Sequence, residues 1–309
     1  MKRVLLATLS AAAMIGVSEA NIISFSETVT DTDFVSAGVG GLRGNGAGTI
    51  GLSGTSGTIN KAYLYWHGPT DSTDPNFNAN VTVNGQQVTG TNIGFSDDNF
   101  WGQLNSQAYR ADVTSLVSGD GSYDISGLPA NNINGASLVV FFDDGDDTNN
   151  RDVVLFEGND ANFANPFDPV GWDITLAGID YEGGTANLQL HVSDGQNFSA
   201  FDDGDLVVNG NILASGGIFQ GDSVPVTPGS SVTNGGLWDI EDFDITGELS
   251  LGLNTLNVTL GDVNDALSVI VAAIDLPVGA APEIPVPAAA FLFGPIAAAA
   301  AWRRRRVAG

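Results

Sequence analysis

The chain contains no cysteine and only two histidines, His67 and His191, in 309 residues. Disulfide bonds and thiolate chemistry are therefore excluded. Two histidines leave little for a histidine-rich metal centre or for a serine-histidine-aspartate triad. Basic residues are also scarce, with 10 lysines and arginines against 36 aspartates and glutamates. Proteins that bind duplex DNA or RNA need cations to neutralise phosphates, so we expect no nucleic-acid partner.

Glycine and aspartate are abundant instead: the chain has 40 glycines, and its aspartates outnumber its glutamates 29 to 7. Both residues favour turns, whereas glutamate is the better helix former, so this balance argues against a helical bundle. Apolar residues make up 43% of the chain, which is enough for a packed core. Short segments that alternate apolar and polar residues, separated by Gly and Asn-Gly turns, predict strands throughout.

Most of the basic residues lie at the two ends of the chain. Between residues 21 and 282, only Arg43, Lys61, Arg110 and Arg151 oppose 34 acidic residues, so the formal charge of this body is 4 − 34 = −30. A strong negative charge keeps a protein soluble and repels it from anionic surfaces unless cations bridge the two. The ends and the body are therefore different kinds of polypeptide.

Residues 1–20 have the pattern of a secretory signal peptide. Lys2 and Arg3 precede an apolar run over residues 4–17, and the segment ends in a small-x-small triplet at Ala20. This order predicts export, with cleavage by signal peptidase after Ala20. The alternative is a buried N-terminal helix, which the paired cations directly before the run disfavour.

The C-terminus combines a proline motif, a short apolar helix and an arginine cluster. The motif covers residues 284–288 and includes Pro285, Pro287 and Ala288, and the apolar stretch covers 288–302. These 15 residues are fewer than the ~20 that a comfortable membrane span needs. By the positive-inside rule, the cluster after them keeps the chain end in the cytoplasm. It consists of Arg303, Arg304, Arg305 and Arg306.

This three-part pattern resembles the sorting signals of the PEP-CTERM class of exosortase-processed proteins. The proline motif is similar to their Val-Pro-Leu-Pro-Ala variant, with Ile284 and Val286 as departures and a tail richer in alanine than in leucine. The resemblance implies a Gram-negative source and an exosortase-type processing enzyme. It also implies transient inner-membrane association, cleavage near the prolines, and release to the cell surface or extracellular matrix. The same residues also fit a permanent single-span anchor.

The body is built from two copies of one pattern. Four segments recur in the same order, with offsets of 124, 125, 132 and 131 residues. Each copy has a Val-Asn-Gly hairpin, whose Asn-Gly pair supplies positive φ angles, and an Asp-x-Thr element, whose side chains bond nearby amides. The paired segments are 62–67 with 186–191, 81–85 with 206–210, 112–117 with 244–249, and 136–142 with 267–273.

We therefore expect an all-β fold of two jelly-roll-like antiparallel β-sandwich repeats. The expected boundaries are 1–20 for the signal peptide, 21–57 for an N-terminal β segment, 58–165 and 166–280 for the repeats, and 281–309 for the sorting signal.

The order of Val-Asn-Gly and Asp-Val-Thr-x-Leu-Val is similar to that in jelly-roll modules that accompany glycoside hydrolases. Residues 58–277 more closely resemble an uncharacterised family of bacterial and archaeal surface domains. That resemblance implies a β-sandwich on the cell surface and carries no assigned activity. The segments that support it are 62–66, 112–117, 135–140, 151–158 and 238–246.

Paired aspartates in Gly/Asn-rich segments are candidate ligands for Ca²⁺, which prefers several oxygen atoms on a flexible loop. The densest segment is 143–152, and a second is 201–205. Neither has the EF-hand spacing, and solvated acidic turns are the alternative, with Arg151 neutralising part of the first cluster. The candidate ligands are Asp143, Asp144, Asp146, Asp147, Asp152, Asp202, Asp203 and Asp205.

Two-residue alternation places Tyr63, Tyr65 and His67 on one face of their strand, opposite the apolar residues 62, 64 and 66. The tyrosine pair, with Trp101 in a later loop, is a candidate platform for stacking on sugar rings. Packing against a second sheet is the alternative. We expect both histidines to lie off the sandwich core, near a loop, in structural roles.

The sequence has no Gly-x-Ser-x-Gly, His-Glu-x-x-His or phosphate-binding glycine loop. We therefore expect a non-catalytic surface or matrix protein that acts in biofilm structure or adhesion, with Ca²⁺ as the one cofactor considered. Two alternatives stay open. The first is a carbohydrate-binding module for extracellular polysaccharide. The second is a glycan-active hydrolase using loop carboxylates, which needs two carboxyl groups ~5 to ~9 Å apart across a cleft.

Overall fold

The computed structural model describes residues 23–99, 102–198, 203–261 and 265–279. In these ranges every regular element is a β-strand, apart from two single-turn 3₁₀ helices, η1 (Thr114–Leu116) and η2 (Thr246–Glu248). None of these described elements is a helix that reaches the length and hydrophobicity of a membrane span. The predicted all-β fold is confirmed. The signal peptide, Trp101, Asp202 and the sorting residues Pro285, Pro287, Ala288 and Arg303 to Arg306 lie outside the described residues.

The described strands, in chain order, are β1 (Ser24–Val39), β2 (Gly48–Leu52), β3 (Thr58–Thr70), β4 (Asn80–Val83), β5 (Gln86–Thr89), β6 (Thr91–Ser96), β7 (Asn105–Asp112), β8 (Gly121–Ser126), β9 (Gly135–Asp143), β10 (Arg151–Ala161), β11 (Asp173–Tyr181), β12 (Asn187–Ser193), β13 (Asp205–Val208), β14 (Asn211–Ser215), β15 (Trp238–Asp244), β16 (Gly252–Leu260) and β17 (Ser268–Pro277). They form a nine-stranded sheet, β15-β12-β17-β10-β1-β9-β3-β7-β6, and two four-stranded sheets, β11-β16-β13-β14 and β2-β8-β4-β5.

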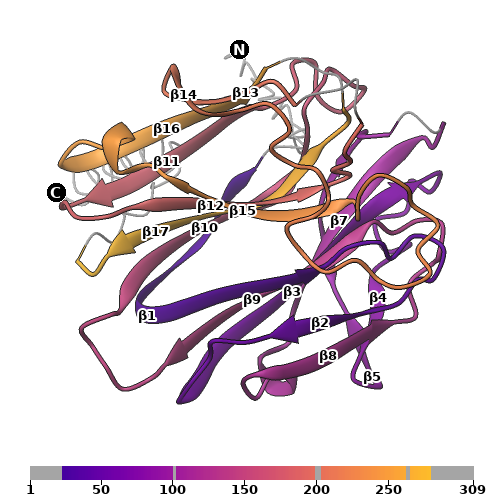
Figure 1. Cartoon of the computed structure of the whole chain (residues 1–309), viewed down its shortest axis with the longest axis horizontal. Helices are drawn as coiled ribbons and strands as arrows, with labels where there is room; N and C mark the ends of the chain where they lie inside the picture. Colours follow the sequence, from indigo (N-terminus) through magenta and orange to yellow (C-terminus); the bar gives the residue numbers. More distant parts are fainter. Residues whose placement is uncertain (1–22, 100–101, 199–202, 262–264, 280–309) are drawn as a thin grey trace, which may run out of the picture.

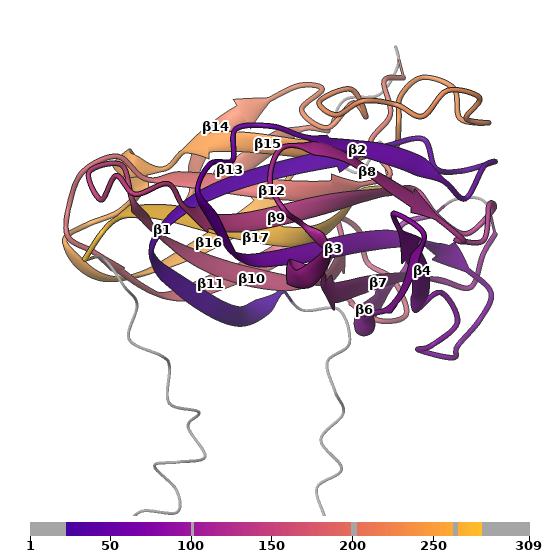
Figure 2. The same ribbon diagram turned by 90° about the horizontal axis from the view of Figure 1, so that it is seen from below.

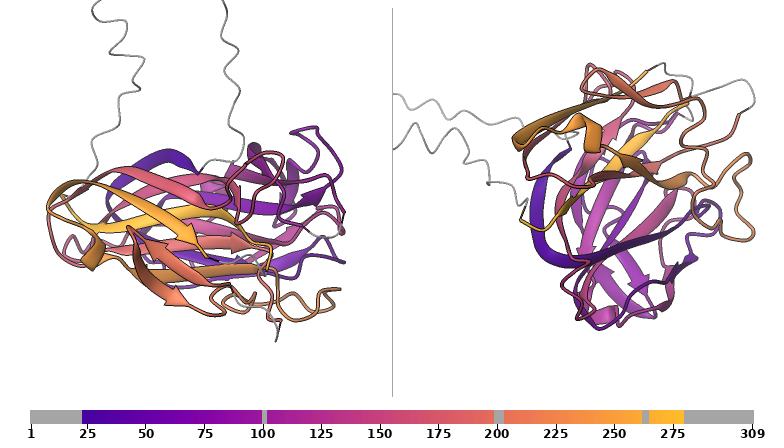
Figure 3. Two further views of the ribbon diagram at one scale, coloured as in Figure 1. Left: turned by 90° about the horizontal axis from the view of Figure 1, so that it is seen from above. Right: turned by 60° about the vertical axis from the view of Figure 1, so that its left-hand side comes forward.

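The nine-stranded sheet has two halves, which we call half-sheets: β9-β3-β7-β6 is the first and β15-β12-β17-β10 is the second. Strand β1 lies between them and belongs to both. Its residues 24–32 pair with β10, and its residues 33–39 pair with β9. The partner changes beside an irregularity where Asp31 has a positive φ of 54° and donates its backbone amide to Asp152 Oδ1 at 2.9 Å. The sheet folds along this strand, and β1 can be followed from one half to the other in Figure 3.

The folded sheet and its two covers give four β layers, stacked from β13 and β14 at the top of Figure 1 to β2 and β8 at the bottom. Strands of both sandwiches run along the long direction of the molecule (Figure 2). Each four-stranded sheet encloses an apolar core against its half of the large sheet. A third core, which we call the seam, lies between the two halves. It contains Tyr63, Tyr65, Ala108, Val139, Phe141, Val153, Leu155, Val224, Trp238, Ile270, Val271 and Ala273.

Strand order confirms the duplication. The first copy has β1-β9-β3-β7 against β2-β8-β4-β5, and the second has β10-β17-β12-β15 against β11-β16-β13-β14. The first sandwich therefore includes strands from residues 24–52, ahead of the expected start at residue 58. Residues 151–161, expected in the first repeat, form β10 and pair with β17 of the second. The continuous nine-stranded sheet joins both repeats into one unit.

The Asn-Gly hairpins have the predicted geometry in both copies. Asn84 and Gly85 have φ angles of 47° and 80°, and Asn209 and Gly210 have φ angles of 51° and 86°. Two successive positive φ angles define the type I′ turn, which matches the twist of the flanking strands. Each asparagine side chain also accepts a hydrogen bond from a backbone amide of the neighbouring strand, β8 or β16.

The two Asp-x-Thr elements are likewise equivalent. The carboxylates of Asp112 and Asp244 each accept the amide of the threonine two residues later at 2.9 Å. The hydroxyl oxygens of Thr114 and Thr246 each accept a backbone amide, that of Ala62 or its counterpart at residue 186, at 2.9 Å. These bonds hold each 3₁₀ turn against the strand that carries a histidine.

Candidate functional site

A group of buried polar side chains lies between the two half-sheets. His67 comes from β3, Asn159 from β10 and Ser193 from β12, and loop residues complete the group. Buried polar groups need hydrogen-bond partners, water or a ligand, so this is the candidate functional site. We call it the seam polar cluster, and it consists of Arg43, His67, Asp98, Asn134, Asn159, Ser193 and Asp194.

His67 connects the two repeats within this cluster. Its Nδ1 lies 2.7 Å from Ser193 Oγ of the other half-sheet, and its Nε2 lies 3.5 Å from Asp98 Oδ2. Burial lowers the pKa of His67, while Asp98 and the Asn159 side chain act in the opposite direction. The side chains of Asp98 and Asn159 therefore both lie close to the imidazole. The amide nitrogen of Asn159 points elsewhere and donates to the Ser106 carbonyl at 3.1 Å.

Arg43 is the cation of the cluster. Its Nη2 lies 3.6 Å from Asp194 Oδ1 and donates to Asn134 Oδ1. Asn134 Nδ2 in turn donates to Ser193 Oγ at 3.0 Å and to Asp194 Oδ1 at 3.2 Å. Burial raises the pKa of Asp194, and repulsion by Asp98 adds to the effect. One guanidinium therefore faces more than one carboxyl group in a low-dielectric space.

Three oxygens of the cluster have no hydrogen-bond partner among the residues that the structure describes. They are both carboxylate oxygens of Asp98 and the amide oxygen of Asn159. Both side chains are fully buried, at 0% exposure. An unsatisfied buried acceptor costs about 1–3 kcal/mol, and a charged one costs more. The cluster therefore has too few donors for all three oxygens, because His67 Nε2, 3.5 Å from Asp98 Oδ2, can serve only one of them.

The second histidine has an equivalent place but a complete set of partners. His191 Nδ1 lies 2.7 Å from Ser137 Oγ of the first half-sheet, and its Nε2 lies 3.0 Å from Gln189 Oε1. Burial lowers its pKa to about 3. Both histidines lie on the strand face away from their sandwich core, as the alternation predicts. The sequence predicted both histidines to lie off the core, near a loop. That prediction is incomplete, because the other half-sheet covers the face that carries the histidines and buries both side chains.

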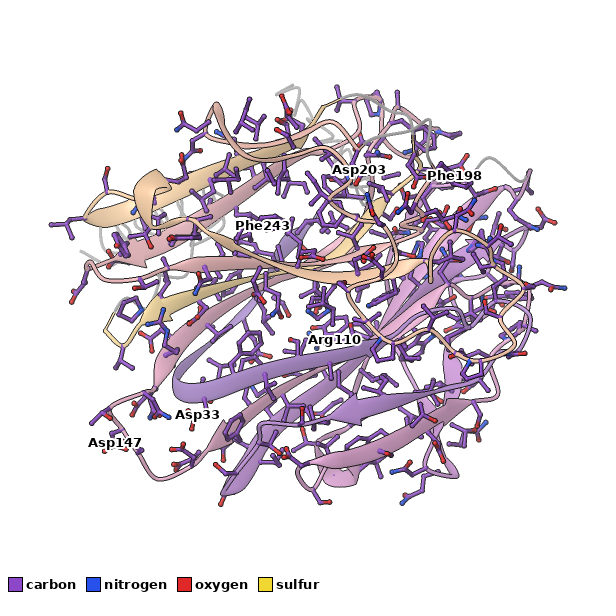
Figure 4. The ribbon with its side chains drawn as sticks, in the orientation of Figure 1. Asp33, Arg110, Asp147, Phe198, Asp203 and Phe243 are labelled. Carbon is purple, nitrogen blue, oxygen red and sulfur yellow. The ribbon has the colours of Figure 1, made fainter. Side chains whose placement is uncertain are left out.

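The tyrosine pair predicted as a sugar platform lies inside the seam. Tyr65 is 0% exposed and donates to Glu157 at 3.0 Å, and Tyr63 donates to Glu27. The Arg110 guanidinium lies 4.6 Å from the Tyr63 ring and bonds Glu157 at 2.9 Å, between the two half-sheets (Figure 4). The rings pack against the second half-sheet, which is the alternative that the sequence left open.

The acidic loop between β9 and β10 is exposed, and Asp147 marks it at the edge of the molecule in Figure 4. Asp143, Asp144 and Asp146 each accept a backbone amide two residues later, at 2.8, 2.8 and 3.1 Å. These are local Asx turns. Asp152 is buried in β10 instead, and its two oxygens accept the amides of residues 31 and 279, each at 2.9 Å.

The second acidic segment also bonds to its own surroundings. Asp203 accepts the amides of Ile218 and Phe219 at 2.5 and 2.7 Å, and Asp205 accepts the Ser215 hydroxyl at 2.6 Å. Figure 4 places Asp203 beside the second sandwich, far from the loop of Asp147. Within the described ranges, no group of three or more histidine or carboxylate side chains is arranged to hold a metal ion. Calcium binding by these two loops stays a prediction.

One further buried acid, Asp160, is not marked by any sequence motif. Burial raises its pKa to about 9, and Asp168 adds both repulsion and a hydrogen bond. Trp172 Nε1 donates to the Asp160 carbonyl at 2.6 Å and fixes the backbone there. At neutral pH Asp160 is therefore a protonated carboxylic acid.

The seam and its polar cluster are absent from the sequence-based predictions. The cluster residues are spread over positions 43–194 and share no motif. The signal for a seam is present, however, in the unbroken apolar runs 138–142, 153–156 and 269–274. Strands buried on both faces have such continuous runs, whereas strands of a simple sandwich alternate.

No family model matches the chain. No curated protein matches it either. Among solved structures, a peptide-N(4)-(N-acetyl-β-D-glucosaminyl) asparagine amidase is similar at 10% sequence identity, with a TM-score of 0.28, over 81% of this chain and 98% of that chain. A similarity of this size carries no information about activity.

Proposed function

We propose that this protein is exported by a Gram-negative bacterium, sorted to its surface or extracellular matrix, and acts there without catalysis in matrix structure or adhesion. The placement of charge is the observation behind this proposal. Six of the ten basic residues lie at the two ends, around a body with a charge of 4 − 34 = −30. The N-terminal segment, with basic residues before an apolar run, is the signal for export. The C-terminal segment, with an apolar run before the arginines, is the signal for sorting.

The surroundings of the reactive side chains support a non-catalytic role. His67 and Asp98 are 0% exposed, and a general acid or base must reach its substrate. The carboxylates of Asp143, Asp144 and Asp146 bond their own backbone on an exposed loop. Stacking on sugars by Tyr65 is not part of the proposal, because its ring is buried.

The fused architecture suits a structural role. The seam and the shared strand β1 join the two sandwiches, so that the acidic residues of both are carried on one continuous unit. Divalent cations outside the cell link such acidic surfaces to each other or to anionic polysaccharide, because each cation neutralises charge on both sides. Adhesion of this kind depends on surface charge and not on a pocket.

Localisation tests the proposal. The full chain is produced in a Gram-negative host that contains an exosortase, with antibodies against the β-sandwich body as probe. We expect the protein on the surface of intact cells or in the matrix, at a lower mass than the 31.8 kDa of the whole chain. Removal of both terminal segments accounts for the mass difference.

The matched variants change the arginine cluster. Replacing Arg303 to Arg306 by four alanines removes the cytoplasmic anchor charge and is expected to reduce sorting, whereas four lysines keep the charge and the sorting. Cytoplasmic protein of full mass, or equal sorting by both variants, contradicts the proposed route. Surface protein that hydrolyses a glycan contradicts the proposed non-catalytic role.

A further inference from the structure

We propose that the seam polar cluster binds one hard divalent cation, of which Ca²⁺ is the best fit, through Asp98 and Asn159. The site is separate from the acidic loops of residues 143–152 and 201–205. The inference goes beyond the proposed surface role and does not depend on how the protein is sorted.

The seam polar cluster has fewer hydrogen-bond donors than acceptors. The hydroxyl of Ser193 accepts Asn134 Nδ2 at 3.0 Å and lies 2.7 Å from His67 Nδ1. A neutral imidazole carries one proton, and the only ring nitrogen near Asp98 in the described structure is Nε2, 3.5 Å from Oδ2. That proton serves one oxygen at most. Two of the three unpartnered oxygens of Asp98 and Asn159 remain without a donor in the described structure.

The charges of the cluster also favour a bound cation. Asp98 and Asp265 both raise the pKa of Asp194 by repulsion, so each of them lies within electrostatic reach of Asp194. The guanidinium of Arg43 bonds Asp194 and Asn134 and is also attracted by Asp98, so that one cation faces two carboxyl groups. A second carboxylate without a counter-ion of its own is strongly unfavourable in a buried site. A cation removes that penalty, whereas a water molecule only supplies hydrogen bonds.

The oxygens of Asp98 and Asn159 have the chemistry of calcium ligands. Carboxylate and amide oxygens are the atoms that Ca²⁺ prefers, and Ca²⁺ accepts both oxygens of one carboxylate in an irregular arrangement. Mg²⁺ demands near-octahedral geometry and gives up its waters reluctantly. Because Asp98 and Asn159 are fully buried, the ion is taken up as the two half-sheets close over it, so that binding and folding are coupled.

The experiment uses protein obtained from the full chain, unfolded, stripped with a chelator and refolded in about 1 mM Ca²⁺, in about 1 mM Mg²⁺ or in neither. We expect one calcium per chain by elemental analysis after gel filtration. The thermal midpoint should be higher by about 5 °C when calcium is about a hundred times its dissociation constant. Protein refolded without calcium should be the less stable form.

Three variants separate this site from the acidic loop. Asp98→Asn should bind no calcium and show no calcium-dependent midpoint, and Asn159→Asp should bind calcium more tightly because it adds a charged ligand. Asp146→Asn, which changes only an exposed Asx turn, should behave as the unmodified protein. If Asp98→Asn does not fold, Asn159→Asp still tests the site.

Two results overturn the proposal. One is a protein that refolds without any bound ion and has the same midpoint in calcium and in chelator, which assigns water to the three oxygens. The other is calcium binding that Asp146→Asn abolishes and Asp98→Asn preserves, which assigns the ion to the loop. Neither result bears on surface sorting, which is measured on cells.

Discussion

The same residue type takes opposite roles in this protein according to its surroundings. Asp146 is exposed, and the hydroxyl and amide of Thr148 lower its pKa by bonding its charged form. Asp160 is buried, and desolvation raises its pKa to about 9. Composition counts both as negative charges, but only the first is ionised at neutral pH. The formal charge of the body therefore overstates the negative charge that the folded protein carries at neutral pH.

This difference predicts the effect of Asp160→Asn. The pKa of Asp160 is higher in the folded chain than in the unfolded chain, so the folded state holds the extra proton from about pH 4 to about pH 9. The contribution of Asp160 to stability is complete below that window and is lost as the pH rises through it, by up to about 1.4 kcal/mol per pH unit. Asparagine keeps a donor without a charge and removes this loss.

Urea denaturation at about pH 5 and about pH 9 measures the effect. We expect Asp160→Asn to lie close to the unmodified protein at the lower pH and to be the more stable of the two at the higher pH. Asp168→Asn is the matched control, since it removes the repulsion but keeps the buried acid. An equal change of stability at both pH values contradicts a raised pKa of Asp160 in the folded protein.

At the scale of single elements, the sequence predicted what short-range chemistry decides. Asn84-Gly85 and Asn209-Gly210 adopt the expected turns, because only residues that tolerate positive φ form them. The tyrosines of β3 were ambiguous, because a polar tip on an apolar body fits a wet surface and a second sheet equally well. The second half-sheet buries Tyr65, and the hydroxyl of Tyr65 donates there to Glu157 of β10, which lies 92 residues away in the chain. The sequence around Tyr65 does not show that a residue so distant in the chain will contact it.

A second prediction concerns the stability cost of replacing the hairpin glycines. Gly85 and Gly210 have φ angles of 80° and 86°, with open space at the position of a Cβ atom, so alanine there costs only backbone strain. We expect Gly85→Ala and Gly210→Ala each to destabilise the protein by about 1–2 kcal/mol in urea denaturation. Gly51→Ala in β2 also has open space but no positive φ, and should be nearly neutral. Unequal costs for the two hairpin variants would show that the copies are not equivalent.

For the whole molecule, duplication left each copy with a sheet face that its own sandwich cannot cover. These two uncovered faces turn toward each other along β1 and cover one another. Phe141 and Leu155 are thereby buried in the seam. Apolar burial of this kind couples the two sandwiches, because opening either one exposes the seam side chains of both. Without cysteine, packing and the buried polar bonds hold the two copies together.

This coupling predicts a single cooperative unfolding transition, with equal calorimetric and van't Hoff enthalpies. Phe141 lies in the seam, 5.6 Å from Phe34 between ring centroids, whereas Leu190 lies in the second sandwich core. Phe141→Ala leaves a cavity in the seam at a cost of about 3–5 kcal/mol, and we expect the calorimetric enthalpy to exceed the van't Hoff value as the sandwiches begin to unfold separately. Leu190→Ala should lower the midpoint while the transition stays single, because it weakens one core without loosening the contact between the two sandwiches.

Two transitions in the unmodified protein would mean that the seam does not couple the copies. A single transition in both variants would place the coupling in β1 instead.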